Sequence, residues 1–165
     1  MLKSAVANSS AQTISQHGFA EVVLNLNTKQ RSLHSLVYFK RNSVITKFEA
    51  EDIFSTPNYL TVQVGLNKHI TLSPNFLQYI NHSCSPNVFF DTQNMELVAL
   101  SDIEPFEEFR FFYPSTELNM SQPFVCFCLS NDCLKNINGA GQTPKDILRK
   151  YRLTDFIYSM VINIK

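Results

Sequence analysis

The chain has 165 residues, of which 44% are hydrophobic, enough for one domain with a packed core. Its 14 basic and 14 acidic side chains give a formal net charge of zero, which argues against a surface that binds nucleic acid or an anionic membrane. No apolar run approaches the ~20 residues of a membrane-spanning helix. We therefore expect a soluble intracellular protein of the cytoplasm or nucleus, with no direct nucleic-acid or membrane partner; composition gives no oligomeric state.

Short β-strands are predicted for the first half of the chain. Residues 1–18 are rich in Ser, Ala, Gln and Asn and are expected to form a flexible N-terminal segment. Strand-forming residues follow at 19–26, 36–39 and 44–45. Residues 59–66 alternate apolar and polar side chains, which predicts a half-buried strand that continues into a second strand at 69–72 after a turn.

The second half of the chain is predicted to add a hairpin, one more strand and a helical end. Residues 87–91 and 96–100 flank a Thr-Gln-Asn turn, and residues 108–113 form a strand that Pro114 ends. Thr143 as N-cap and Pro144 at the first position predict a helix start, followed by one or two amphipathic helices. The predicted fold class is mainly β with a small helical C-terminus.

The cysteines are the first candidate site. Cys126, Cys128 and Cys133 form a Cys-x-Cys-x-x-x-x-Cys segment, and Cys84 lies some forty residues before them. Three local sulfurs plus a remote one commonly hold a structural tetrahedral zinc ion. Two disulfides or free thiols remain the alternative, although residues 1–20 lack the continuous apolar segment of a secretory signal.

Three sequence blocks together resemble the SET-domain family of lysine methyltransferases. Residues 81–87 read NHSCSPN, where the family has Asn-His-Ser-Cys-x-Pro-Asn. Residues 107–113 read EEFRFFY, where the family has Glu-Glu-Leu-Thr-Phe-Asp-Tyr, and the three clustered cysteines match a post-SET segment. The resemblance covers roughly residues 19–140 and implies a SET-like fold of short strands and hairpins with a post-SET zinc loop.

The resemblance also implies a cofactor, S-adenosylmethionine, and a set of site residues. Tyr113 matches the terminal tyrosine of the family motif and is expected to be catalytic, with Phe111 and Phe112 in the substrate channel. Such an enzyme positions an unprotonated amine and excludes water. The residues expected at the cofactor are Leu33, His34, Tyr79, Asn81, His82, Phe124 and Phe127. Phe124 and Phe127 have a second interpretation as packing around the zinc. The four cysteines are the implied zinc ligands.

Several positions depart from the family pattern. The Gly-x-Gly of the N-terminal cofactor loop is replaced by Gln30 and Ser32, and His34 stands where an apolar aromatic residue is usual. Phe106 replaces the glycine that opens the second motif, and Phe112 replaces the Asp before its tyrosine. A basic residue before the first motif is also replaced, by Gln78.

Two functional hypotheses follow. The first is an S-adenosylmethionine-dependent methyltransferase that acts on a protein lysine or another nucleophile. The second is a repurposed SET scaffold, either a small-molecule enzyme with non-methyl chemistry or a non-catalytic binding module. In both, residues 19–120 form the SET-like domain, 121–140 the zinc segment and 141–165 a C-terminal helical segment.

Overall fold

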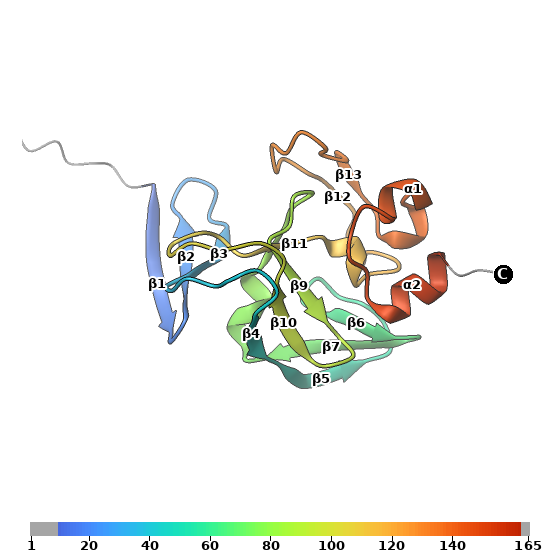
Figure 1. Ribbon diagram of the computed structural model, residues 1–165, viewed down its shortest axis with the longest axis horizontal. Coiled ribbons are helices and arrows are strands. Elements are labelled where there is room, and N and C mark those ends of the chain that lie inside the picture. The colour runs from blue at the N-terminus through green and yellow to red at the C-terminus, as the bar shows by residue number, and fades with distance from the viewer. Residues whose placement is uncertain (1–9, 163–165) are drawn as a thin grey trace, which may run out of the picture.

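Short β-strands dominate the computed structural model of the protein, which describes residues 10–162 (Figure 1). The sheet of β1, β2 and β3 lies at one end of the molecule and the two helices lie at the other. Within the described residues no helix is long and apolar enough to cross a membrane. The predicted mainly β class with a helical C-terminus is confirmed.

The N-terminal sheet is antiparallel, with β2 in the centre. Its strands are β1 (Ala11–His17), β2 (Ala20–Asn25) and β3 (Arg31–Ser35). Gly18 takes a positive φ of 60° in the turn between β1 and β2, a conformation that glycine adopts without a side-chain clash. The predicted flexible segment is therefore wrong for residues 11–17, which form a strand, and its residues 1–9 lie outside the described range.

The strand predicted at 36–39 is also wrong. The residues that pair with β2 are those of β3, which ends at Ser35. Within residues 36–39 only Phe39 has a β-bridge, to Ile103. Val37 and Tyr38 are 43% and 50% exposed, so their β-propensity finds no buried surface to cover.

Two further antiparallel sheets form the centre of the molecule. One contains β4 (Val44–Lys47), β10 (Glu96–Ala99) and β9 (Val88–Asp91). The other contains β5 (Glu49–Phe54), β7 (Lys68–Ser73) and β6 (Val62–Gly65). The predicted β9–β10 hairpin is confirmed, and its turn is held by the Asp91 carboxylate, which accepts from the backbone N–H groups of Gln93 and Asn94.

The predicted strand at 59–66 begins only at Val62. Thr61 and Asn58 close a turn just before it, in which Thr61 Oγ1 accepts from the Asn58 N–H at 3.0 Å and the Asn58 side chain accepts from the Leu60 N–H at 2.8 Å. These side-chain bonds compete with strand pairing.

Two short strands bring the sequence blocks together. β8 (Asn81–His82) pairs in parallel with β11 (Arg110–Phe111), so that Asn81 lies opposite Arg110 and His82 opposite Phe111. The strand predicted at 108–113 is thus reduced to two residues, because the chain turns into a 3₁₀ helix at Tyr113–Ser115. The Asn87 side chain fixes this crossing, since it accepts from the Arg110 N–H and donates to the Glu108 carbonyl, both at 2.8 Å.

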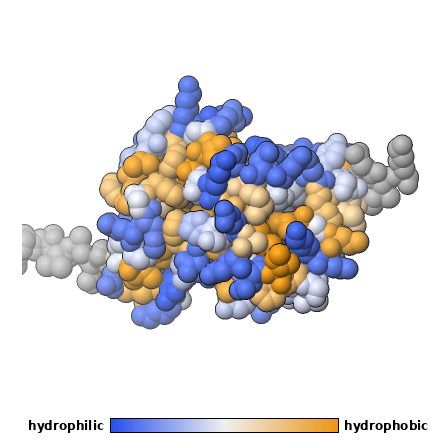
Figure 2. Space-filling model, turned by 90° about the horizontal axis from the view of Figure 1, so that it is seen from below, coloured by the Kyte–Doolittle hydropathy of each residue, from blue (hydrophilic) through white to orange (hydrophobic). Residues whose placement is uncertain are grey.

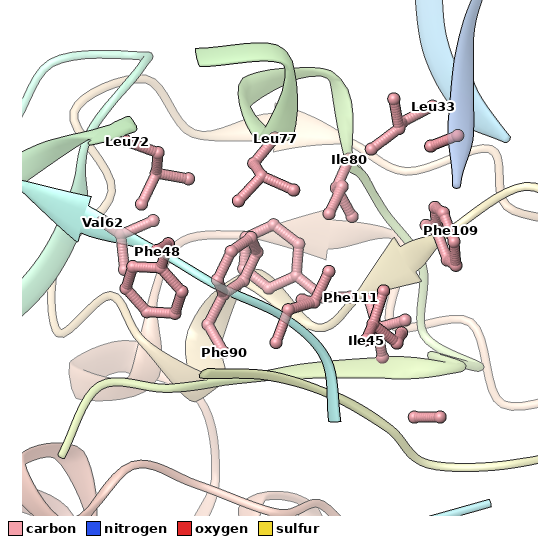
Figure 3. Close-up of a cluster of buried hydrophobic side chains, with 14 of the residues drawn as sticks. Leu33, Ile45, Phe48, Val62, Leu72, Leu77, Ile80, Phe90, Phe109 and Phe111 are labelled. Atoms are coloured by element: carbon pink, nitrogen blue, oxygen red, sulfur yellow. The ribbon is translucent and has the colours of Figure 1, made fainter. Parts of the chain in front are cut away.

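The main core lies between the sheets and is rich in phenylalanine (Figure 3). Phe90 is central to it, with its ring 5.5 Å from that of Phe48 and 4.9 Å from that of Phe111 in edge-to-face arrangements. The other core residues labelled in Figure 3 are Leu33, Ile45, Val62, Leu72, Leu77, Ile80 and Phe109. On the surface, apolar and polar residues are mixed over the face shown in Figure 2.

The C-terminal helices pack on a second, smaller core. They are α1 (Lys145–Leu148) and α2 (Asp155–Val161), and Leu148, Ile157 and Val161 are buried against Phe112. Thr143 is not the N-cap of α1, because its hydroxyl donates to the Gly139 carbonyl at 2.8 Å and Pro144 occupies the cap position. The side-chain cap belongs to α2, where Thr154 accepts from the Ile157 N–H.

Candidate active site and metal centre

The crossing of β8 and β11 places a histidine beside a tyrosine. The Tyr113 backbone N–H donates to Nδ1 of His82 at 3.2 Å, and their rings meet edge to face with centroids 5.2 Å apart. The Tyr113 hydroxyl lies 3.4 Å from the Ile80 carbonyl, to which it donates. These hydrogen bonds and the ring contact fix the orientation of both side chains.

A polar cavity of about 390 Å³ opens on one side of this pair. Segment 124–128 forms one wall of it and comprises β12 (Phe124–Val125) and the start of the loop that leads to β13 (Asn136–Ile137). The other lining residues all have polar or charged side chains: Gln30, Asn81, His82, Glu108 and Arg110. The volume falls in the range of small-molecule sites. We call this cavity the polar cleft.

Hydrogen bonds organise the polar cleft. The Asn81 side-chain amide donates to the Arg31 carbonyl at 2.9 Å and to Glu108 Oε1 at 3.2 Å, which ties β8 to β3. Arg110 Nε is buried and has no hydrogen-bond partner among the described residues.

A second cavity of about 270 Å³ lies on the Tyr113 side of the pair, whereas His82 lines the polar cleft. Its lining combines aromatic rings with one carboxylate, and comprises Asn58, Tyr59, Thr61, Phe111, Tyr113, Glu117 and residues 120–124. Phe124 lines both cavities, and its ring centroid is 5.5 Å from that of His82 and 5.9 Å from that of Tyr113. We call this second space the aromatic cavity. Phe124 therefore lies between the two cavities, with His82 lining the cleft and the adjoining Tyr113 lining the aromatic cavity; we call these three side chains the shared wall.

Burial sets the protonation of the shared wall. Desolvation lowers the pKa of His82 to about 4, so its imidazole is neutral near pH 7. Because Nδ1 accepts from Tyr113, the neutral ring carries its proton on Nε2, which lies 3.4 Å from Cys84 Sγ. Burial also raises the pKa of Tyr113 to about 12, so its phenol remains a donor.

Glu117 is the single carboxylate of the aromatic cavity. It is 7% exposed, and Oε1 accepts from the Gln63 N–H at 2.8 Å and from the Thr116 hydroxyl at 3.2 Å. Burial raises the pKa of Glu117 to about 7, against the opposing effect of these two donors. The carboxyl therefore changes charge near neutral pH.

The four cysteines converge beside the polar cleft. The Sγ atoms of Cys84, Cys126, Cys128 and Cys133 all lie within 4.8 Å of one another, although Cys84 comes from the loop after β8 and the others from the loop between β12 and β13. Cys84 and Cys126 are buried.

The donor set of this cluster suits a metal ion. Backbone N–H groups donate to the sulfurs, from Leu134 to Cys84 and from Cys128 to Cys126, each at 3.4 Å. Burial raises the pKa of the Cys126 thiol to about 11, and a bound cation would counter this by favouring the thiolate. Four sulfurs with no oxygen ligand match a closed tetrahedral site for a soft or borderline metal.

The structure assembles most of the predicted site residues. Asn81, His82, Phe124 and Phe127 line the polar cleft, and Phe111 and Tyr113 line the aromatic cavity. Phe124 and Phe127 therefore face a cavity and are not restricted to packing around the cysteines.

Four predicted site residues lie elsewhere, and those predictions are corrected. Leu33 is fully buried in the main core, because alternation along β3 turns it away from the cleft. His34 Nδ1 bonds the Phe106 carbonyl at 3.0 Å, and the Tyr79 hydroxyl accepts from Arg31 at 2.8 Å; neither lines a cavity. Phe112 points to the opposite side from Phe111 and stacks on Tyr151 with centroids 3.7 Å apart.

Sequence reasoning missed Glu117, Glu108 and Arg110 as lining residues. Glu117 follows Tyr113 by four residues, one helical turn, and its backbone N–H bonds the Tyr113 carbonyl at 3.0 Å. That spacing was the available signal, since it places two side chains on the same side of a turn. Glu108 and Arg110 alternate with Phe109 and Phe111 along the motif, so their polar side chains face away from the core.

Comparisons with known proteins identify the family and the fold of the chain. The SET domain family model matches residues 11–114. Methyltransferase flvH of Aspergillus flavus is 33% identical over 143 residues, which cover 86% of this chain and 80% of that protein. The crystal structure of KRYPTONITE in complex with mCHG DNA and SAH has a similar fold, with a TM-score of 0.53 and 22% identity over 67% of this chain. The chain spans only 27% of the length of that structure.

Proposed function

Because the chain belongs to the SET-domain family, we propose that it is a methyltransferase that uses S-adenosylmethionine to methylate an amine. The observation that carries this proposal is the contact of His82, which lines the polar cleft, with Tyr113, which lines the aromatic cavity, beside Phe124, which lines both. A donor in one space and an acceptor in the other would meet at Tyr113. Positioning of this kind is the main catalytic requirement of a displacement reaction.

The polar cleft suits the cofactor. S-adenosylmethionine supplies a methyl group on a sulfonium, which leaves as a neutral sulfide. Its amino-acid end carries a carboxylate and an ammonium, and the cleft offers the Arg110 guanidinium for the first and the Glu108 carboxylate for the second. The flat faces of Phe124 and Phe127 are available to the purine.

The aromatic cavity suits a neutral amine. The rings of Phe111 and Tyr113 pack against each other with centroids 4.6 Å apart and give the cavity an aromatic wall that would desolvate a bound group. Desolvation of this kind disfavours an ammonium group and thereby helps to present a nucleophilic nitrogen. The Tyr113 hydroxyl, already oriented toward the Ile80 carbonyl, would position the reacting group at the wall.

The cysteine cluster has a structural role in this proposal, with one zinc ion bound by all four sulfurs. Its position links Cys84, two residues after His82, to the 124–128 wall of the polar cleft. The ion would therefore hold Phe124 and Phe127 against the cofactor. With four protein ligands the site has no open position for catalysis.

Calorimetric titration with S-adenosylmethionine tests the proposal, combined with detection of S-adenosylhomocysteine formed with small amines and lysine peptides as acceptors. We expect binding by the wild type and weaker binding by Asn81→Ala, because that variant releases Glu108 and the Arg31 carbonyl at the edge of the cleft. Ser32→Ala is a control on the adjacent strand β3, outside both cavities. Absence of cofactor binding by the wild type would reject the proposal.

A further inference from the structure

Glu117 occupies an unusual position for a carboxylate. It is 7% exposed and lines the aromatic cavity, yet it forms no ion pair with any described residue. Its Oε1 has two donors, whereas no described residue donates to Oε2. Oε2 is also not among the fully buried polar atoms without a partner, so it keeps some accessible surface on a side chain that lines the cavity.

A buried carboxylate without a counter-charge is energetically unfavourable, and a cation brought by a ligand would relieve that cost. The cavity lining holds no Lys or Arg that could supply the charge instead. Its remaining polar groups are the phenols of Tyr59 and Tyr113, the side chains of Asn58, Thr61, Ser121 and Gln122, and backbone. The space thus combines aromatic walls with a single anion, which is how proteins recognise alkylammonium groups.

We propose that Glu117 binds a cationic group of the methyl acceptor that is separate from the reacting nitrogen, so that the acceptor is a small diamine-like compound. This inference rests on the proposed methyltransferase function and specifies its substrate class. The cavity of about 270 Å³ suits a short flexible molecule.

The chemistry explains why the bound cation is not the reacting nitrogen. That nitrogen must be neutral, because its lone pair forms the new N–C bond while the C–S bond breaks and its electron pair stays on sulfur; the methylated ammonium then releases its proton to water. A carboxylate beside the reacting nitrogen would favour the protonated form, which has no lone pair. A lysine in a peptide offers its only side-chain cation as the reacting group, whereas a diamine offers one nitrogen to Glu117 and one to the methyl group.

Binding measured without a methyl donor tests the inference independently of methyl transfer. The probes are 1,4-diaminobutane and the neutral 1,4-butanediol, titrated by calorimetry into the wild type, with and without S-adenosylhomocysteine. We expect the diamine to bind at least about tenfold more tightly than the diol, and Glu117→Gln to abolish that preference. Glu51→Gln, an exposed residue on β5, is the matched control and retains the preference. Equal affinity for diamine and diol in the wild type overturns the inference.

A pH series on the wild type covers the case in which Glu117→Gln does not fold. The diamine stays charged from about pH 6 to about pH 8, because aliphatic amines titrate near 10. Burial raises the pKa of Glu117 to about 7, and the phenols of Tyr59 and Tyr113 are the other titratable groups of the cavity lining. Diamine affinity should therefore rise across this interval as Glu117 ionises; a constant affinity contradicts the inference.

Turnover measurements distinguish a failure of the proposed substrate class from a failure of the proposed function. With S-adenosylmethionine present, we expect kcat/KM for 1,4-diaminobutane to exceed that for butan-1-amine by about tenfold or more, because the single nitrogen of the monoamine pairs with Glu117. Equal values, or efficient methylation of a lysine peptide with no diamine preference, overturn the inference and leave the proposed function standing. If no acceptor is methylated, the proposed function fails, and the binding titrations still decide whether Glu117 selects cations.

Discussion

His82 and Tyr113 are joined by a hydrogen bond from the Tyr113 backbone N–H to Nδ1 of His82, 3.2 Å long. This bond fixes the tautomer of a neutral imidazole whose Nε2 faces Cys84 Sγ at 3.4 Å. The same ring lines the polar cleft and packs against Phe124. One histidine therefore connects the cysteine cluster, the cleft and the backbone that carries the tyrosine, so a metal ion bound by the cysteines would act on the cleft and on Tyr113 through this ring.

Tyr113→Phe should lower turnover roughly a hundredfold, because it removes one oriented hydroxyl donor at the shared wall. The fold should persist, since the ring and its packing remain. Steady-state kinetics and calorimetry with S-adenosylmethionine check this, with cofactor affinity expected to be unchanged. Tyr79→Phe is the matched control, because its hydroxyl bonds Arg31 outside both cavities. Unchanged kcat in Tyr113→Phe would exclude a catalytic role for the hydroxyl.

Protein purified without chelators should contain one zinc ion per chain, and Cys133→Ser should lose it. Ser130→Ala removes only the hydroxyl near Cys128 Sγ and should retain the metal. After chelation, hydrogen exchange should accelerate at Ile137 on β13 before Leu97 on β10, because a zinc ion bound by the four cysteines would close the loop that β12 and β13 flank. Metal analysis that finds no stoichiometric zinc in the wild type would reject the site.

Glu117 should make stability depend on pH. Its pKa is raised from 4.5 to about 7 by burial, so the folded chain holds this proton more tightly than the unfolded chain. The stability contributed by the protonated carboxyl is complete below about pH 4.5 and is lost as the pH rises through about 7. Glu117→Gln resembles the protonated form and should remove this loss, which amounts to at most about 3 kcal/mol.

The difference between Glu117→Gln and wild type is the quantity to measure. His82 opposes Glu117, because its pKa is lowered to about 4 and its contribution is lost as the pH falls below about 6.5. Urea unfolding at about pH 5 and about pH 8 gives the free energy of unfolding of both proteins. The variant should gain stability relative to wild type at the higher pH, and a difference independent of pH would contradict the assignment.

Phe106 provides a test of backbone strain. Its φ is 69°, in the left-handed region, and its ring is 68% exposed, so the side chain contributes little packing. The family motif has glycine at this position. Phe106→Gly should raise the free energy of unfolding by about 1 kcal/mol, because it removes the clash of a Cβ in that conformation. Phe106→Ala retains the Cβ and should bring no such gain; equal stabilisation by both variants would assign the effect to the ring.

The family blocks made the fold and part of the candidate site predictable, because parallel pairing of β8 with β11 brings together the two motifs that the sequence displays. The misreadings concern residues whose environment is set by distant partners. Phe112 was assigned to the channel, but Tyr151 from the C-terminal segment stacks on it. Glu117 was missed because a lone carboxylate after Ser-Thr resembles a solvated turn; it is buried through the N–H of Gln63, 54 residues away in sequence.

Gln30 stands where the family has the first glycine of the cofactor loop, and it lines the polar cleft. Its substitution therefore tests how this loop affects cofactor binding. Neither Gln30 nor Ser32 has a positive φ, so the loss of glycine costs no backbone strain here. Any effect on the cofactor must come from side-chain volume. Ser32 lies within β3, where its hydroxyl is 2.9 Å from His34 Nε2, and does not line the cleft.

Gln30→Gly should therefore tighten S-adenosylmethionine binding, and Ser32→Gly should leave affinity unchanged while lowering stability by roughly 0.5–1 kcal/mol through the entropy of a strand glycine. The Gln30→Gly/Ser32→Gly variant should show the affinity of the first and the stability of the second, because the two effects are independent. Calorimetric affinities and urea unfolding of all three variants check this. If Gln30→Gly binds more weakly than wild type, the Gln30 side chain is itself a cofactor contact, and the glycine-free loop is an adaptation of the cleft and not an obstruction.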